Sequence, residues 1–125
     1  SGLIRRAQGA PAAKTTSTTL TGAEVIGGII TVNQGGGAAS ALQLPTGSNI
    51  EAAISPALAT GDAFDLSVIN ISTVAAEDAS ITTNTGMTLV GDMNFSANDA
   101  VTARSSGILR FRKTASNTFS VYRLA

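Results

Sequence analysis

Two pairs of carboxylates are the first places in this sequence where acid–base or metal chemistry would be sought. Asp62 and Asp65 flank the start of an apolar alternation, and Glu77 and Asp78 are adjacent. Neither pair has a third ligand at a suitable spacing or the glycine-containing loop of a calcium site. Because a strand alternates its faces, Asp65 would point to one side only. We interpret both pairs as solvated loop carboxylates, so the sequence predicts no metal site.

Nucleophilic catalysis lacks its usual partners in this chain. The sequence contains no His and no Cys, which removes the commonest general base, thiolate chemistry, disulfides and Cys/His metal sites. A Ser–Lys arrangement stays open in principle, with Lys14 and Lys113 only. The glycine run 35–37 resembles a phosphate-binding loop, but no Lys-Ser/Thr pair follows it. The sequence therefore predicts a protein that is not an enzyme and has no cofactor or small-molecule substrate.

The composition favours one small packed domain among the 125 residues. Hydrophobic residues make up 43% of the chain, but only four Phe and one Tyr are aromatic and Trp is absent. Such a thin core gains stability from association. The formal net charge is zero, whereas nucleic-acid binding needs a broad basic surface. No apolar run matches a membrane span, and residues 1–6 lack the apolar segment of a secretory signal. We therefore expect a protein that is made and used without export.

The order of charges along the chain has two interpretations. Basic residues occur only near the start and in the last quarter, and every acidic residue lies from Glu24 to Asp99. One interpretation is ordinary cross-strand pairing within a domain. The other is a basic face that meets an acidic face of a neighbouring subunit, which would set register and partner choice. The candidates for this inter-subunit pairing are Arg104, Arg110, Arg112, Glu77 and Asp78.

Short strands with regular turn signals dominate the sequence from Ala63 onward. Phe64, Leu66 and Val68 alternate with residues of the opposite face. This pattern predicts an all-β, antiparallel sandwich or small barrel. The expected strands are 29–33, 41–44, the run from 63, and 79–83, 87–90, 93–96, 101–104, 108–113 and 118–124. The expected core is Phe64, Leu66, Val68, Leu89, Phe111 and Phe119, with both residues of the last pair pointing inward.

Two short helices are expected before these strands. Thr21 is a suitable N-cap for a turn through Val25 and Ile26, which two glycines terminate. Ser48 and Glu51 have the spacing of a capping box, in which each side chain bonds the backbone near the other residue. The second helix would then run to Ile54, before the Ser-Pro step.

Four segments resemble a small β-domain found in virion proteins of tailed bacteriophages. They are Leu-Gln-Leu-Pro-Thr at 42–46, Gly-Asp-Ala-Phe-Asp-Leu-Ser-Val-Ile-Asn at 61–70, Thr-Gly-Met-Thr-Leu-Val-Gly at 85–91 and Phe-Ser-Val-Tyr-Arg-Leu at 119–124. The resemblance covers residues 20–124. It implies a trimer-forming, jelly-roll-like β-sandwich with no active site.

The same resemblance implies two candidate functions. The first is a capsid decoration (cement) protein, assembled in the host cytoplasm, which binds the major capsid protein on the outer shell and bridges capsid subunits. The alternative is a trimeric fibre or knob module that binds a host receptor or glycan. A knob usually follows a repetitive shaft, which this sequence lacks, and a glycan site usually has exposed aromatic residues, of which Tyr122 is the single Tyr. The sequence therefore favours the decoration protein.

Residues 1–19 are predicted to form an extended N-terminal arm, and residues 20–125 the sandwich domain. The arm is rich in Gly, Ala and Thr and has no apolar mass of its own. We expect it to leave its domain and add a strand to a neighbouring subunit or the capsid protein. Fully extended, it spans about 60 Å. On the partner, its aliphatic side chains would fill a small apolar pocket, its cations would pair with carboxylates, and its Thr run would bind a sheet edge. The candidate partner-binding residues are Leu3, Ile4, Arg5, Arg6, Lys14, Thr16 and Thr18.

Overall fold

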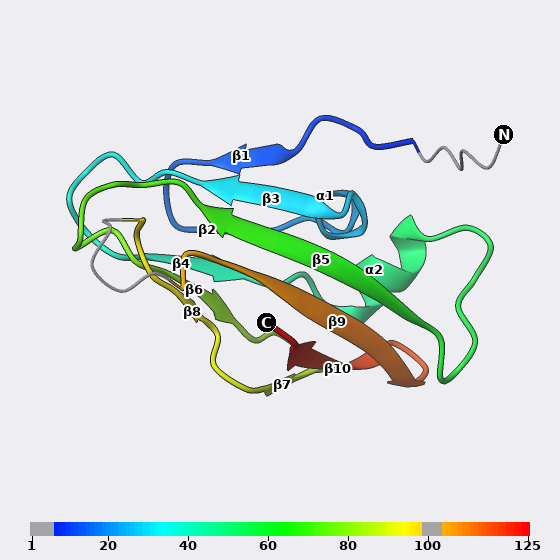
Figure 1. Cartoon of the computed structure of the whole chain (residues 1–125). Helices are drawn as coiled ribbons and strands as arrows, with labels where there is room; N and C mark the ends of the chain where they lie inside the picture. Colours follow the sequence, from blue (N-terminus) through cyan, green and yellow to red (C-terminus); the bar gives the residue numbers. More distant parts are fainter. Residues whose placement is uncertain (1–6, 99–103) are drawn as a thin grey trace, which may run out of the picture.

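The computed structural model describes residues 7–98 and 104–125, which form two β-sheets and two short helices (Figure 1). The helices are α1, Gly22–Ile26, and α2, Gly47–Ala53. The strands are β1 Ala12–Lys14, β2 Thr18–Thr19, β3 Ile29–Val32, β4 Ser40–Gln43, β5 Ala63–Asn70, β6 Ala79–Thr82, β7 Met87–Val90, β8 Asn94–Phe95, β9 Ser106–Ala115 and β10 Thr118–Arg123. Neither helix of this described part has the length and apolar character needed to cross a membrane.

The chain alternates between the two sheets as it advances. Sheet A has the order β1-β3-β5-β9-β10-β7, and sheet B has the order β2-β4-β6-β8. The runs β1-β3-β5 and β2-β4-β6 are parallel, since the chain returns through the other sheet between their strands, whereas β6–β8, β5–β9 and β9–β10 are antiparallel. The expected β-rich, two-sheet class is confirmed. The expectation of antiparallel pairing is wrong, because the described strands make five parallel and three antiparallel pairs.

One hydrophobic core lies between the inner faces of the two sheets. Sheet A contributes Leu66, Val68, Leu109, Phe111 and Phe119, all fully buried. From the other side, the core receives Leu42, Ile81 and Phe95 of sheet B, and Val25 and Ile50 of the helices. The expected inward orientation of Phe111 and Phe119 is confirmed.

Two residues of the expected core are only partly buried. Phe64 and Leu89 pack against the core from its margin. The Phe64 ring stacks on Phe111 with a centroid separation of 4.9 Å, and it meets Phe119 edge-on at 6.3 Å. These aromatic contacts join the start of β5 to the β9–β10 hairpin.

The helix starts test the capping predictions. Thr21 caps α1 as expected, and its side chain and that of Glu24 bond each other's backbone N–H groups. The Ser48 capping box is wrong, because α2 begins earlier and its N-cap is Thr46, whose Oγ1 accepts from Asn49 N at 3.1 Å. Gly47 lies so close to the Asn117 carbonyl that a Cβ there would collide with it.

The described part of the predicted arm belongs to the sandwich. β1 pairs with β3, and β2 pairs with β4. The prediction that residues 1–19 leave their own domain is therefore wrong for residues 7–19, because the same chain supplies two open sheet edges within their reach. Residues 1–6 and 99–103, which include most of the expected strand 101–104, lie outside the described residues.

Candidate interaction surface

Asp62 and Asp65, which the sequence analysis considered as a pair, make separate contacts in the structure. The Asp62 side chain accepts a hydrogen bond from Ala59 N at 2.9 Å and closes the turn before β5. The Asp65 carboxylate is held by the Arg110 guanidinium on the neighbouring strand β9. The two acids therefore do not share a ligand or a proton. Asp62 is an exposed loop carboxylate, as interpreted from the sequence, whereas Asp65 lies within strand β5 and is paired.

Glu77 was expected on the surface and is instead buried. It is 3% exposed, and its carboxylate accepts hydrogen bonds from Ser72 Oγ and from Gly37 N, the latter at 2.8 Å. The prediction that Glu77 forms an inter-subunit ion pair is therefore wrong, since a neighbouring subunit cannot reach it. Its neighbour Asp78 is partly buried and accepts from Ala97 N at 2.9 Å.

The buried carboxylate belongs to a polar cluster that fixes the loops opposite the helices. Asn70 is 1% exposed, and its Nδ2 donates to the backbone carbonyls of Glu77 and Phe95, each at 2.9 Å. Its Oδ1 accepts from Ser72 N at 3.0 Å. Within residues 7–98 and 104–125, His, Cys, Asp and Glu side chains form no group of three or more that would hold a metal ion. The cluster is therefore a structural connection.

The outer side of sheet A is the broadest continuous array of strands that neither the helices nor sheet B covers. The strand registers arrange its side chains in rows across the sheet. One row contains Val90, Tyr122, Arg110 and Asp65, and the next contains Thr88, Ser120, Arg112 and Ala63. On the other side of the first row lie Ile108, Ser67 and Ile29. We call these residues the outer face.

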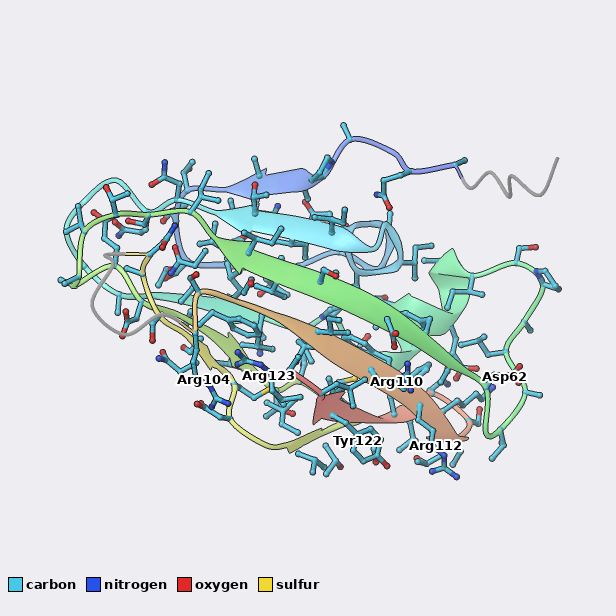
Figure 2. The ribbon with its side chains drawn as sticks, in the orientation of Figure 1. Asp62, Arg104, Arg110, Arg112, Tyr122 and Arg123 are labelled. Carbon is cyan, nitrogen blue, oxygen red and sulfur yellow. The ribbon has the colours of Figure 1, made fainter. Side chains whose placement is uncertain are left out.

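Arginine and tyrosine lie together on the outer face, as Figure 2 shows for Arg110, Arg112 and Tyr122. Arg110 donates to both carboxylate oxygens of Asp65, at 2.7 and 2.9 Å. This hydrogen bonding lowers the pKa of Asp65, so its charge and the pair persist well into the acid range. Arg112 is exposed, and it makes no ion pair with another described residue.

Aliphatic groups surround these charges. Ile108 precedes Arg110 by two residues on β9 and is 38% exposed, and Val90 is the register partner of Tyr122 and is 45% exposed. A hollow of about 280 Å³ opens beside Ile108, between Ile69 and Ala125. The outer face therefore combines a shallow aliphatic surface with the Arg110–Asp65 ion pair and with Arg112, which forms no ion pair among the described residues.

The remaining predicted contact residues lie apart from the outer face. Lys14 pairs with Glu24 of α1 in the same chain, and Thr18 lies in β2. Burial raises the pKa of Glu24, but its bonds to Lys14 and Thr21 outweigh this effect and lower it. Thr16 is exposed in the turn between β1 and β2. Arg104 comes no nearer than 3.9 Å to Asp92, and Leu3, Ile4, Arg5 and Arg6 lie outside the described residues.

Sequence reasoning missed the contribution of Arg123. Its guanidinium lies 3.9 Å above the Phe95 ring and donates to the carbonyls of Asp92 and Asn94 at 3.0 Å. Burial lowers the pKa of Arg123, but the group stays a cation. An arginine in a strand next to an aromatic partner from another sheet has no local sequence signal. Tyr122, in contrast, had one, since it is the single Tyr and stands at an outward position of the last strand.

No protein family, curated protein or solved structure matches this chain.

Proposed function

We propose that this chain is a non-enzymatic virion protein of a tailed bacteriophage, a decoration protein that stabilises the capsid by binding its outer surface through the outer face. The observation that carries the proposal is the position of Tyr122 between Arg110 and Val90 on an uncovered sheet. Tyr and Arg are the residue types most enriched at the energetic centres of protein interfaces.

The shape of the outer face supports a protein partner better than a small ligand. Its Ser, Thr and Ala side chains are short, so another flat surface approaches the strands closely. Small-molecule sites are concave and bury most of their ligand, whereas the hollow beside Ile108 is small and open. The four segments that resemble phage virion domains then indicate which protein partners to test first.

Bridging by a long arm is not part of this proposal, because residues 7–19 are built into the sandwich. Shell stabilisation would instead come from the body of the protein, clamped across the junction of capsid subunits. The trimer implied by the resemblance remains part of the proposal, with copies meeting around an axis lined by apolar or Thr side chains. Sedimentation on the free protein and on dissociated particles tests the trimer, and monomers in both preparations would exclude it.

The shell contact is tested with a matched pair of valines. Val90 lies on the outer face and Val74 in the β5–β6 loop, with similar exposures of 45% and 48%. The variants Val90→Asp and Val74→Asp are incubated with empty shells, lacking this protein, of the virus that carries the sequence. We expect Val90→Asp and Tyr122→Ser to weaken binding at least about tenfold, since one buried charge or lost anchor has this effect at an interface centre. Val74→Asp should bind like the wild type.

Three results would contradict the proposal in different ways. Equal binding by Val90→Asp and Val74→Asp would exclude the outer face as the contact. Failure of the wild-type protein to bind or protect shells would exclude the decoration function. Binding to host cells in place of shells would establish the fibre or knob alternative.

A further inference from the structure

The outermost strands of the two sheets differ in how well their free edges are protected. Among the described strands, sheet A ends in β1 and β7, and sheet B ends in β2 and β8. β2 and β8 have two residues each, and β1 follows Pro11 and ends in Lys14. Short strands, Pro and Lys prevent a free edge from pairing with another chain. β7, Met-Thr-Leu-Val, has four residues and neither a charge nor a Pro. It is therefore the least protected edge of the described strands.

The backbone of β7 directs one residue toward the open side of the sheet. On the other side, the Gly86 carbonyl accepts from Phe119 N of β10 at 2.8 Å. Because alternate residues of a strand bond the same neighbour, Thr88 and Val90 also direct their backbone groups to β10. The N–H and C=O of Leu89 point away from β10, and they have no hydrogen-bond partner within residues 7–98 and 104–125.

The start of the same edge is closed by the chain itself. Met87 also faces away from β10, but its N–H donates to the Asn84 carbonyl at 3.0 Å. Its carbonyl accepts from Thr83 Oγ1 at 2.8 Å. A second strand therefore finds its free hydrogen-bonding groups at Leu89 and beyond, and not at Met87.

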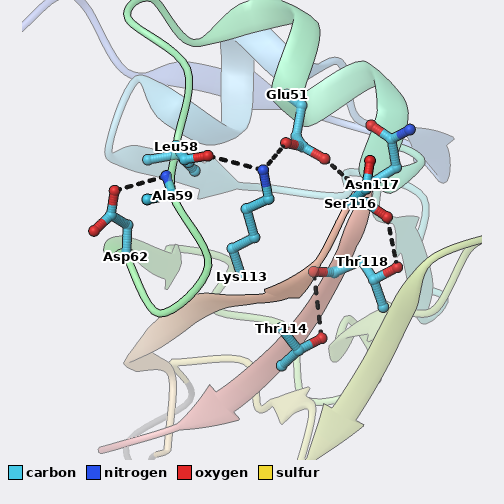
Figure 3. Close-up of polar contacts among 9 residues, drawn as sticks. All are labelled: Glu51, Leu58, Ala59, Asp62, Lys113, Thr114, Ser116, Asn117 and Thr118. Atoms are coloured by element: carbon cyan, nitrogen blue, oxygen red, sulfur yellow. Dashed lines mark hydrogen bonds and ion pairs between the residues drawn. The ribbon is translucent and has the colours of Figure 1, made fainter.

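The edge is held in a fixed position by the turn of the β9–β10 hairpin (Figure 3). Asn117 N of this turn donates to Glu51 of α2, and Thr118 Oγ1 donates to the Ser116 carbonyl at 2.9 Å. Gly86, directly before β7, packs so closely on the Asn117 carbonyl that a Cβ there would collide with it. The edge is therefore preformed, and a partner strand would not need to order it.

We propose that β7 pairs antiparallel with β7 of a second copy of this chain, around a two-fold axis at Leu89. In an antiparallel pair, a residue with both backbone groups directed at the partner exchanges two hydrogen bonds with the residue opposite. A two-fold axis at Leu89 meets this condition, because it makes Leu89 of each copy the partner of the other. The two copies of sheet A then form one continuous sheet, in the manner of strand addition.

The same register brings compatible side chains together. Thr88 of each copy lies opposite Val90 of the other, on the outer face. Val90 is 45% exposed, and a cross-strand contact with Thr88 would cover part of it. Asp92 lies opposite Gly86, so no like charges face each other across the axis. The register thus pairs the exposed aliphatic residue of the edge without a charge conflict.

This contact is separate from the contacts of the proposed function. A two-fold contact does not close a trimer, so it would join chains of neighbouring trimers or two free chains. The outer faces of the two copies lie on the same side of the joined sheet and stay uncovered. The contact can therefore be tested on the isolated full chain, whether or not that chain binds a capsid.

Disulfide capture tests the register, since the chain has no native Cys. The single variants Thr88→Cys and Val90→Cys are mixed and oxidised mildly. The opposed positions would have Cα atoms about 4.5 Å apart, within disulfide range. In either variant alone the two thiols would be diagonal neighbours about 7–8 Å apart, beyond that range. We expect the linked dimer to form in the mixture at least about tenfold more than in either variant alone.

Two other results of the capture experiment would overturn the proposal. Linkage of Val90→Cys alone at the level of the mixture would indicate another register or a face-to-face contact. The control mixture is Ser120→Cys with Tyr122→Cys, on the adjacent strand β10 of the same face. A yield in the β7 mixture no higher than in this control would show that the edge does not pair.

Hydrogen exchange tests the same contact in the wild-type protein. The Leu89 N–H should exchange at least about tenfold more slowly at high than at low protein concentration, because the second copy bonds it. Ala13 N–H is the matched control: the Lys14 carbonyl accepts from Asn33 N at 2.8 Å, so Ala13 faces the open side of β1. Its exchange should not depend on concentration. Slower exchange at both amides would indicate head-to-tail pairing of β7 with β1, and no change at Leu89 would exclude the contact.

Discussion

The two sides of β9 differ in their surroundings: one faces the hydrophobic core and the other faces solvent. On the inner side, Leu109 and Phe111 are fully buried in the core. On the outer side, their neighbours Ile108 and Arg110 are exposed. The inner side determines the stability of the domain, because burial of apolar surface is the main favourable contribution to folding. The outer side contributes little to the core, so under the proposed function stability and binding should respond to different substitutions in the same strand.

The largest expected effect comes from the inner side. Phe111→Ala removes a fully buried ring that also stacks on Phe64, so the free energy of unfolding should fall by about 3–5 kcal/mol. The matched outer variant is Ile108→Ala, which should change it by about 0.5 kcal/mol or less. Urea unfolding followed by circular dichroism measures both. A similar loss in the two variants would remove the distinction between the sides.

Asn70→Ala tests whether the inner side also depends on polar contacts. The substitution leaves two buried carbonyls and one buried N–H without their side-chain partner. Unsatisfied buried groups of this kind cost about 1–3 kcal/mol. Denaturant unfolding should show that loss, and hydrogen exchange should be faster at Ser72 in particular. An unchanged midpoint would mean that water replaces the amide.

Two hydroxyl side chains at the start of α2 allow a bonded residue to be compared with an exposed, unbonded one two positions away. Thr46 accepts from Asn49 N, whereas Ser48 is exposed and its hydroxyl makes no hydrogen bond to another described residue. Thr46→Ala should lower the free energy of unfolding by about 0.5–2 kcal/mol. Ser48→Ala should be nearly neutral in the same assay. The opposite ranking would restore the capping box that the sequence predicted.

The smallest effect is expected on the outer side, at Asp65. The bond from Arg110 lowers the pKa of Asp65 in the folded protein, so the pair stabilises the fold above the ordinary aspartate pKa and loses this effect as pH falls through the folded value. Asp65→Asn should therefore be slightly less stable than wild type at neutral pH and equal to it in acid. Thermal unfolding at several pH values measures the difference, and Arg110→Met should give the same profile. A difference that grows in acid would contradict the assignment.

The sequence predicted local features well where the signal and its partner lie close together. The alternation from Phe64 to Val68 identified the buried side of β5, and Thr21 identified the start of α1. It failed where the partner is distant. The residue alternation within a strand does not specify which sheet the strand joins. The sequence therefore could not predict that the chain alternates between the two sheets, or that parallel pairs result.

The candidate surface shows the same limit. Arg110 was expected to pair with a neighbouring subunit, but it pairs with Asp65 of its own chain, which was considered only as a possible acid–base residue. Glu77 resembled a solvated loop residue because one of its two partners, Gly37, comes from a different loop, the one between β3 and β4. Chain segments 12–14 and 18–19 looked unable to order themselves, and they are ordered by open edges that only the folded domain provides.

The position of the last hairpin determines when the protein can finish folding. β9 and β10 fill the middle of sheet A between β5 and β7, although they follow all the other described strands in the chain. Until residues 106–123 leave the ribosome, β5 pairs only with β3 among the described strands. Sheets that depend on such distant pairing fold slowly. During that interval the edge of β5 is open, which is the condition under which another chain could supply the missing hairpin.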